Sequence, residues 1–176
     1  MRQLKEVRIW SPRQRSRDQF VDDISPHSSA PIIAAQTAEA AVRGADLIVL
    51  VTSSPTPVIE DAWVEAGAHV VCVGACRPTQ QEMPPMLVKR GRVYVDSTAA
   101  ALVESGDIVR NIEAGLFGAS HVRGEIGELL LNKTAWNKLP ADLKAVVEGA
   151  VMATIAETYT FNVQRNAVAL TYTLEY

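Results

Sequence analysis

The chain has 176 residues, enough for one ordinary domain with an appendage. Its 48% hydrophobic and 21% charged residues are typical of a soluble globular protein. A net charge of -3 gives no reason to expect a nucleic-acid partner, and no apolar run approaches the length of a membrane span. Cys72 and Cys76 are too few for a disulfide framework, so we expect a reducing, cytoplasmic location.

Short apolar runs recur along the first half of the chain. Each is continuous rather than alternating, which predicts strands that are covered on both faces. In chain order these runs are 7–10, 31–35, 47–51, 69–73 and 93–95.

Helix-compatible stretches lie between these runs. The stretch 37–45 has Thr37 as its expected N-cap and Gly44 as its stop, and 78–89 and 97–104 have similar character. Strands that alternate with helices predict a mostly parallel, doubly wound α/β sheet.

The character of the sequence changes after residue 107. Helix-forming segments follow one another at 107–113, 125–131 and 141–169. We therefore expect two parts: an α/β domain over 1–131 and a helical extension over 132–176.

The first candidate binding feature is the turn after the strand predicted at 7–10. In a dinucleotide-binding sheet the second strand usually ends in an acid that binds ribose hydroxyls, whereas NADP sites place Arg there. Here Ser11 and Arg13 follow the strand, and no acid occurs before Asp18. Guanidinium and hydroxyl groups suit a phosphate, although a solvated arginine-rich turn is the other interpretation.

Two further candidates follow the next central strands. Thr52 and Ser53 place hydroxyl groups at the carboxyl end of the strand predicted at 47–51, where ligands bind in open α/β sheets. Gly74 and Ala75 follow the strand at 69–73 and allow close approach of a ring to the backbone. A common polar strand-to-helix turn is the alternative for the hydroxyl pair.

The sequence favours neither a nucleophile nor a metal site. Cys76 has no base beside it in sequence, and a free cysteine is more often a small core residue. His27, His69 and His121 are far apart and lack metal-ligand spacing, so we predict no metal.

Several segments, in this order and spacing, resemble the ornithine cyclodeaminase/mu-crystallin family of NAD(P)-dependent enzymes. They are VRIWSPRQRSRDQF, ADLIVLVTSSPTPVI, AGAHVVCVGACRP, VYVDSTAAALVESGDI and SHVRGEIGELL. The resemblance implies a Rossmann-type domain, a small amino or imino acid as substrate, and imine reduction or oxidative deamination. It favours NADP(H) over NAD(H) as the cofactor. The cofactor-binding residues that it implies are Ser11, Arg13, Thr52, Ser53, Val73, Gly74 and Ala75.

The chain departs from this family in three ways. The glycine fingerprint and the strand before it are missing, as is the amino-terminal half with its basic substrate-binding residues and dimer contacts. In the order 3-2-1-4-5-6, the missing strand belongs between the runs at 7–10 and 47–51. We therefore expect either that these two strands pair directly or that their edges recruit another chain, a homodimer being one such arrangement.

The third departure lies at Cys76. Cyclodeaminases carry Asp there and mu-crystallin-like members carry Ser, so the imine-reductase branch is the closer match. A thiol does not replace a carboxylate base, so no catalytic residue is carried over. The sequence predicts a truncated or fused enzyme form with impaired turnover.

The tail leaves other interpretations open. Residues 128–170 resemble the helical carboxyl-terminal region of TRAP-transporter solute-binding proteins, which suggests a fusion and, as an alternative function, a solute-receptor remnant. A divergent helical tail on the sheet is the simpler account. A non-catalytic NADP(H)-binding interaction protein is a further alternative.

Overall fold

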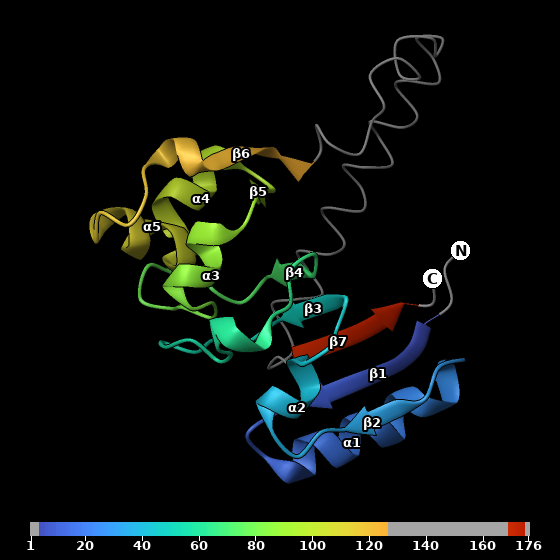
Figure 1. Ribbon diagram of the computed structural model, residues 1–176. Coiled ribbons are helices and arrows are strands. Elements are labelled where there is room, and N and C mark those ends of the chain that lie inside the picture. The colour runs from blue at the N-terminus through green and yellow to red at the C-terminus, as the bar shows by residue number, and fades with distance from the viewer. Residues whose placement is uncertain (1–3, 127–168, 175–176) are drawn as a thin grey trace, which may run out of the picture.

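The computed structural model describes residues 4–126 and 169–174 (Figure 1). Its strands are β1 Leu4–Trp10, β2 Ile32–Ala34, β3 Leu47–Leu50, β4 His69–Cys72, β5 Val93–Val95, β6 Val122–Glu125 and β7 Ala169–Leu174. Its α-helices are α1 Gln14–Ile24, α2 Ala38–Val42, α3 Pro85–Arg90, α4 Thr98–Glu104 and α5 Gly106–Glu113. Short 3-10 helices lie at Ser25–His27, Asp61–Trp63 and Ala119–His121. No helix among the described residues is both long and apolar enough to cross a membrane.

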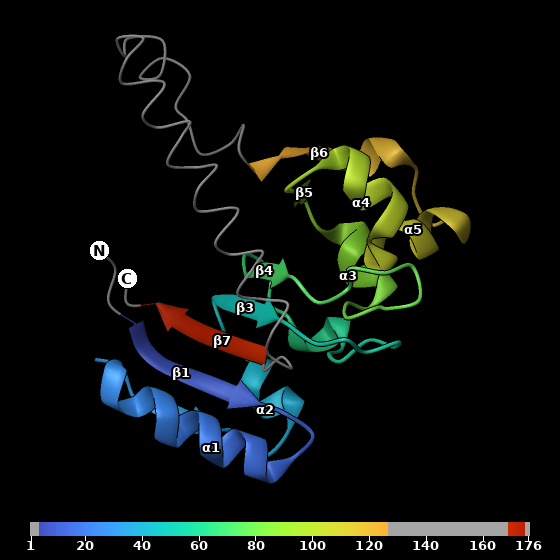
Figure 2. The same ribbon diagram turned by 180° about the vertical axis from the view of Figure 1, so that it is seen from behind.

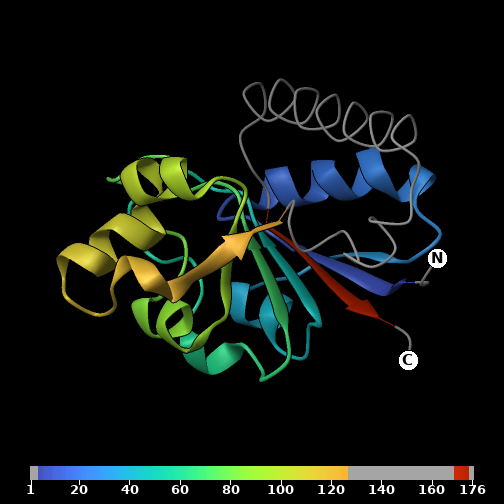
Figure 3. The ribbon, with the colours of Figure 1, turned by 90° about the horizontal axis from the view of Figure 1, so that it is seen from above.

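The main sheet has five strands in the order β2-β1-β7-β3-β4. β1 and β2 are parallel, as are β3 and β4, and β7 runs antiparallel to both of its neighbours. Helix α1 lies on one face of this sheet and α2 on the other (Figure 3). The second, two-stranded sheet of β5 and β6 lies with α3, α4 and α5 in a separate group beside β4 (Figure 2). The predicted α/β architecture with parallel strands is confirmed.

All five predicted strands form, and no end differs from its expected position by more than three residues. The predicted cap of α2 also forms, because the Thr37 hydroxyl accepts a hydrogen bond of 3.0 Å from the Ala40 amide. Gly44 ends this region with a φ of 71°, a conformation that glycine adopts without strain. The helix predicted over 78–89 begins only at Pro85, since the preceding residues form a loop that is held by other contacts.

One prediction for the second half is wrong and another is shifted by one residue. Val122–Glu125 forms β6, which pairs in parallel with β5. The helix predicted over 125–131 has only Ile126 among the described residues beyond this strand, and that residue is helical. Within the helical extension expected over 132–176, Ala169–Leu174 forms β7. Alternating threonines and an aromatic residue suit a strand once partners are available on both sides. The helix predicted over 141–168 lies outside the described residues.

β7 occupies the position that was expected to be empty. It pairs with β1 from Leu174 opposite Leu4 to Ala169 opposite Trp10, and with β3 through Leu170 opposite Val49. The expectation that β1 and β3 pair directly is therefore wrong, and the two inner edges do not need a second chain. Unpaired strand edges are costly, and this chain covers them with its own carboxyl-terminal strand.

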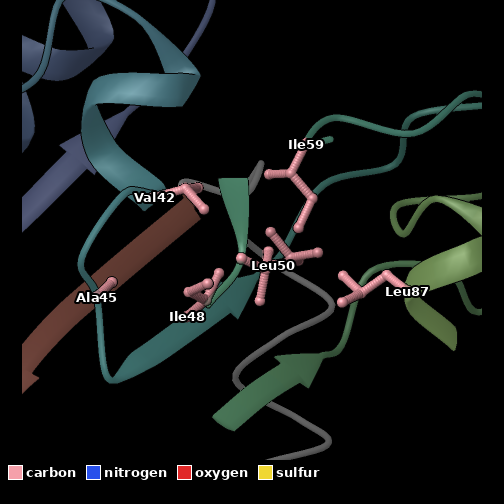
Figure 4. Packing of buried hydrophobic residues seen from close by; sticks show 7 residues of the cluster. Val42, Ala45, Ile48, Leu50, Ile59 and Leu87 are labelled. Atoms are coloured by element: carbon pink, nitrogen blue, oxygen red, sulfur yellow. The ribbon is translucent and has the colours of Figure 1, made fainter. Parts of the chain in front are cut away.

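The core lies around β3. Ile48 and Leu50 are fully buried and pack with five further residues from α2, α3 and the loops that follow α2 and β3 (Figure 4). The complete cluster is Val42, Ala45, Ile48, Leu50, Ile59, Val64 and Leu87. A smaller cluster of Val7, Ile9 and Ala30 supports β1 beneath α1. The two clusters hold the carboxyl ends of β1 and β3 in place.

The pairing of β7 makes a testable prediction. Thr171 lies opposite Arg8 on one side and Ile48 on the other. Thr171→Pro removes one ladder donor, so we expect the free energy of unfolding in urea to fall by about 1–3 kcal/mol. Amides of β1 and β3 that face β7 should exchange faster with solvent. Thr171→Val keeps the amide and serves as the control, and equal stability of the two variants would contradict the pairing.

Candidate functional site

The candidate site lies along one edge of the main sheet. β1 and β3 both run antiparallel to β7, so their carboxyl ends meet at the same edge, and β4 ends there beside β3. Ligands bind at this edge in open α/β sheets. Each predicted cofactor-binding group follows one of these three strands: Ser11 and Arg13 after β1, Thr52 and Ser53 after β3, and residues 73–75 after β4.

The turn after β1 is held from inside the protein. Helix α1 begins at Gln14 with Arg13 as its N-cap; no side chain caps it, and no acid stands in its first turn. Arg17 is 7% exposed, and its guanidinium donates a hydrogen bond of 2.6 Å to the carbonyl oxygen of Ser11. Arg17 Nε has no partner among the described residues. Arg17 therefore supports the turn, while Arg13 stays exposed and the first helical amides keep their partial positive charge.

The ends of β3 and β4 are joined by one buried carboxylate. Glu82 has no exposed surface. Its Oε1 accepts a hydrogen bond from the Thr52 amide, and its Oε2 accepts one of 2.7 Å from the Gly74 amide. The structure thus brings Thr52 and Gly74 together, whereas Ser11 is separated from them by β7. The ends of β1 and β3 are two strand spacings apart, about 10 Å, and the end of β4 is one spacing further.

Close packing explains why position 74 is glycine. A Cβ atom on Gly74 would overlap the carbonyl oxygen of Thr52 and lie 2.6 Å from Glu82 Oε1. The sequence predicted that a ring would approach the backbone at this glycine. In the structure the Thr52 carbonyl at the end of β3 approaches it. Ala75 beside it is buried, Thr52 is half-buried and Ser53 is exposed.

A second buried acid completes this network. Asp107, 1% exposed at the start of α5, accepts hydrogen bonds through Oδ1 from the amides of Glu82 (3.0 Å) and Met83 (2.9 Å). The thiol of Cys72 lies 3.0 Å from Glu82 Oε2 and 2.9 Å from Asp107 Oδ2. Burial, reinforced by the two carboxylates, raises the pKa of the Cys72 thiol, which keeps its proton and donates it.

The same three side chains are close enough to share a cation. Their ligand atoms lie within 4.8 Å of one another, the one such group of three found among the described residues. Both oxygens of Glu82 already accept backbone N–H groups, however, so a metal would compete with these donors for the carboxylate. The cluster fits a hydrogen-bonded brace better than a metal centre.

Cys76 is exposed, and its thiol donates a hydrogen bond of 2.9 Å to the Val73 carbonyl. Partial burial, and after it the acids nearby, raises the pKa of this thiol. A neutral thiol is a poor nucleophile, so the geometry gives the nucleophile interpretation no support.

Sequence reasoning missed three supporting residues. The sequence patterns above single out none of Arg17, Glu82 and Asp107 as a supporting residue. The available signal was that Glu82 and Asp107 are acids within otherwise apolar or loop segments, which can indicate a buried carboxylate. Their partners lie 25 and 30 residues away in the chain, which no local pattern reveals.

Comparison with known proteins identifies the family. The model of the ornithine cyclodeaminase/mu-crystallin family matches residues 1–156. The chain belongs to this family. The match continues through residues 128–156, so the expected resemblance of this part of the tail to TRAP-transporter solute-binding proteins is wrong.

Curated relatives include reductases. The chain is 34% identical over 127 residues to ketimine reductase mu-crystallin of Rattus norvegicus, covering 72% of this chain and 37% of the rat protein. It is 32% identical over 136 residues to Delta(1)-pyrroline-2-carboxylate reductase of Bacillus cereus, covering 77% of this chain and 42% of that protein. The chain thus spans about two fifths of the length of these relatives.

Solved structures show the same fold. An archaeal alanine dehydrogenase with bound NAD aligns at a TM-score of 0.64 with 30% identity, over 69% of this chain and 37% of the other. The iminosuccinate reductase of Paracoccus denitrificans in complex with NAD+ aligns at 0.63 with 28% identity, over 70% and 37%. These neighbours support a nicotinamide cofactor and a Rossmann-like fold for the family.

The buried Asp107 predicts a pH-dependent stability. Burial raises the pKa of this carboxyl, against the opposing hydrogen bonds from Cys72 and two amides. The folded state therefore binds the proton more tightly than the unfolded state. Stability from this group is fully present below a pH of about 4 and is lost as pH rises through the folded-state pKa.

Asp107→Asn removes this charge but keeps Oδ1 as an acceptor. We expect the unfolding free energy of Asp107→Asn, relative to wild type, to rise with pH above about 4 in urea titrations. Asp107→Ala, the control, also lacks the titrating carboxyl but leaves two amides without an acceptor, so it should show the same pH trend and lie about 1–3 kcal/mol below Asp107→Asn at every pH. A constant difference between Asn variant and wild type from acid to neutral pH would contradict the assignment.

The contact of Gly74 with the end of β3 is also testable. In Gly74→Ala the added methyl group must push away the Thr52 backbone and the Glu82 side chain. We therefore expect the free energy of unfolding to fall by about 1–3 kcal/mol. Gly118→Ala is the matched control, because a Cβ atom there meets no neighbour within 4 Å and its φ of -99° suits any residue. Equal stability of the two variants would show that the ends of β3 and β4 are less closely packed.

Proposed function

We propose that this chain is the cofactor-binding part of an NAD(P)H-dependent enzyme that reduces imines of small amino acids or, in reverse, oxidatively deaminates them. Family membership and the names of the relatives support this reaction class. We further propose NADP(H) rather than NAD(H) as the preferred cofactor.

The observation that carries the proposal is the turn between β1 and α1. Ser11, the exposed Arg13 and the uncapped amino end of an eleven-residue helix follow one another directly after β1, at the position where the second strand of a dinucleotide-binding sheet ends. Helix amino ends and Arg are the groups that bind phosphate. No acid stands there to repel a 2′-phosphate, which is the basis for the NADP(H) preference.

The nicotinamide half belongs, in this proposal, at the ends of β3 and β4. Thr52 and Ser53 would line the cleft, and the backbone at Val73, Gly74 and Ala75 would support the ribose and ring. A bound cofactor would supply the hydride, while these residues orient it. The free thiols of Cys72 and Cys76 suit a reducing compartment, so the proposal includes a cytoplasmic location.

A second candidate, binding without efficient turnover, is favoured by β7. In a Rossmann fold the central strand is parallel and leads into a helix whose amino end holds the pyrophosphate. Here the central strand is antiparallel, so it begins at the ligand edge, and no described helix follows it there. Turnover of cyclic imines with NADPH distinguishes the two candidates.

Calorimetric titration tests the proposal. The wild-type chain should bind NADPH more tightly than NADH, and the NADPH affinity should fall with added salt. Arg13→Ala should weaken NADPH binding about tenfold, the loss of one charge-assisted hydrogen bond, and leave NADH binding unchanged. Arg43→Ala, an exposed arginine in an i,i+4 ion pair with Glu39, is the control. A folded chain that binds neither nucleotide would overturn the proposal.

A further inference from the structure

We propose that Glu82 is a positioning residue that locks the carboxyl ends of β3 and β4 together and so shapes the nicotinamide half of the cleft. The assignment of that half rests on the proposed function. Glu82 itself is fully buried and reaches the cleft only through the backbone that it holds.

The chemistry of the contact requires a carboxylate. One oxygen of Glu82 accepts the Thr52 amide and the other accepts the Gly74 amide, with the Cys72 thiol as a third donor. Every partner is a donor, so the side chain must accept at both of its oxygens. An amide side chain accepts at one atom only, and its NH2 group would face an N–H group.

The backbone of the 81–82 segment extends the same lock. The Gln81 amide donates to the Ser54 carbonyl at 2.8 Å, and the Glu82 carbonyl accepts the Val58 amide at 3.0 Å. The loop after β3 is therefore held at three points by two consecutive residues. It cannot shift relative to the end of β4 unless these bonds break together.

Asp107 keeps Glu82 in this position. Its carboxylate accepts the amides of Glu82 and Met83, which fixes the backbone from which the Glu82 side chain extends. Gly106, the residue before it, packs so closely that a Cβ atom would lie 2.7 Å from the Arg77 carbonyl oxygen. The start of α5 thus holds the segment that carries Glu82 in place.

The adenosine half of the cleft has a separate support. The turn at Ser11 is held by Arg17, and β7 stands between β1 and β3. Loss of the Glu82 lock should therefore affect ligands that reach β3 and β4 and spare ligands that bind only at the β1 turn. This asymmetry distinguishes positioning from a general loss of stability.

Calorimetry with three probes tests the asymmetry. Glu82→Gln should weaken NADPH and NADH about tenfold and leave 2′,5′-ADP, which carries only the adenosine half, unchanged. Glu82→Asp retains two acceptor oxygens and should recover part of the loss. Glu60→Gln, an exposed acid after β3, is the matched control. Equal weakening of all three ligands, or of none, would overturn the positioning role.

Amide hydrogen exchange by NMR tests the lock without any ligand. In wild type the Thr52 and Gly74 amides should exchange slowly. In Glu82→Gln at least one should exchange faster, while the Val73 amide, bonded to Leu50, stays protected. Fast exchange of both amides in wild type, or unchanged protection in the variant, would overturn the proposal even where the variant binds poorly. If the wild-type chain binds no dinucleotide, the proposed function is overturned. The exchange rates of the Thr52 and Gly74 amides still test whether Glu82 holds the ends of β3 and β4 together, because that measurement needs no ligand.

Discussion

The structure depends on how the slot between β1 and β3 is filled. Each of these strands has one neighbour on its outer side, and their inner edges would otherwise leave a row of backbone groups unpaired. β7 pairs with both edges at once, through six positions of β1 and three of β3. The two apolar clusters, one beneath α1 and one around Ile48 and Leu50, become parts of a single sheet only through this strand.

The direction of β7 sets the character of the candidate edge. A parallel central strand would bring a helix amino end to the middle of this edge, whereas an antiparallel one brings its own first residues. The candidate edge is thereby divided into an outer half at the β1 turn and an inner half at the ends of β3 and β4. Each half is supported by its own buried polar side chain, Arg17 in one and Glu82 in the other.

The candidate site could be predicted in outline but not in its supports. Hydroxyl residues and arginines directly after apolar runs indicated the candidate edge, because strand ends are local features of a sequence. The role of Gly74 was predicted only in part. The sequence indicates that a glycine here allows a close approach to the backbone, but the group that makes this approach is the Thr52 carbonyl after β3, which is distant in sequence. Cys72, Glu82 and Asp107 form a network only because three distant segments meet in the fold.

By itself the sequence determined the five apolar strands, the cap at Thr37, the family and the expectation of a gap in the sheet. These depend on side-chain periodicity, capping and motif order, which are read within a few residues. Only the tertiary structure decided what fills the gap, which way that strand runs, and which acids join the ends of β3 and β4. Pairing of residues some 160 positions apart, such as Arg8 with Thr171, is selected by the free energy of the whole sheet, so a local pattern does not contain it.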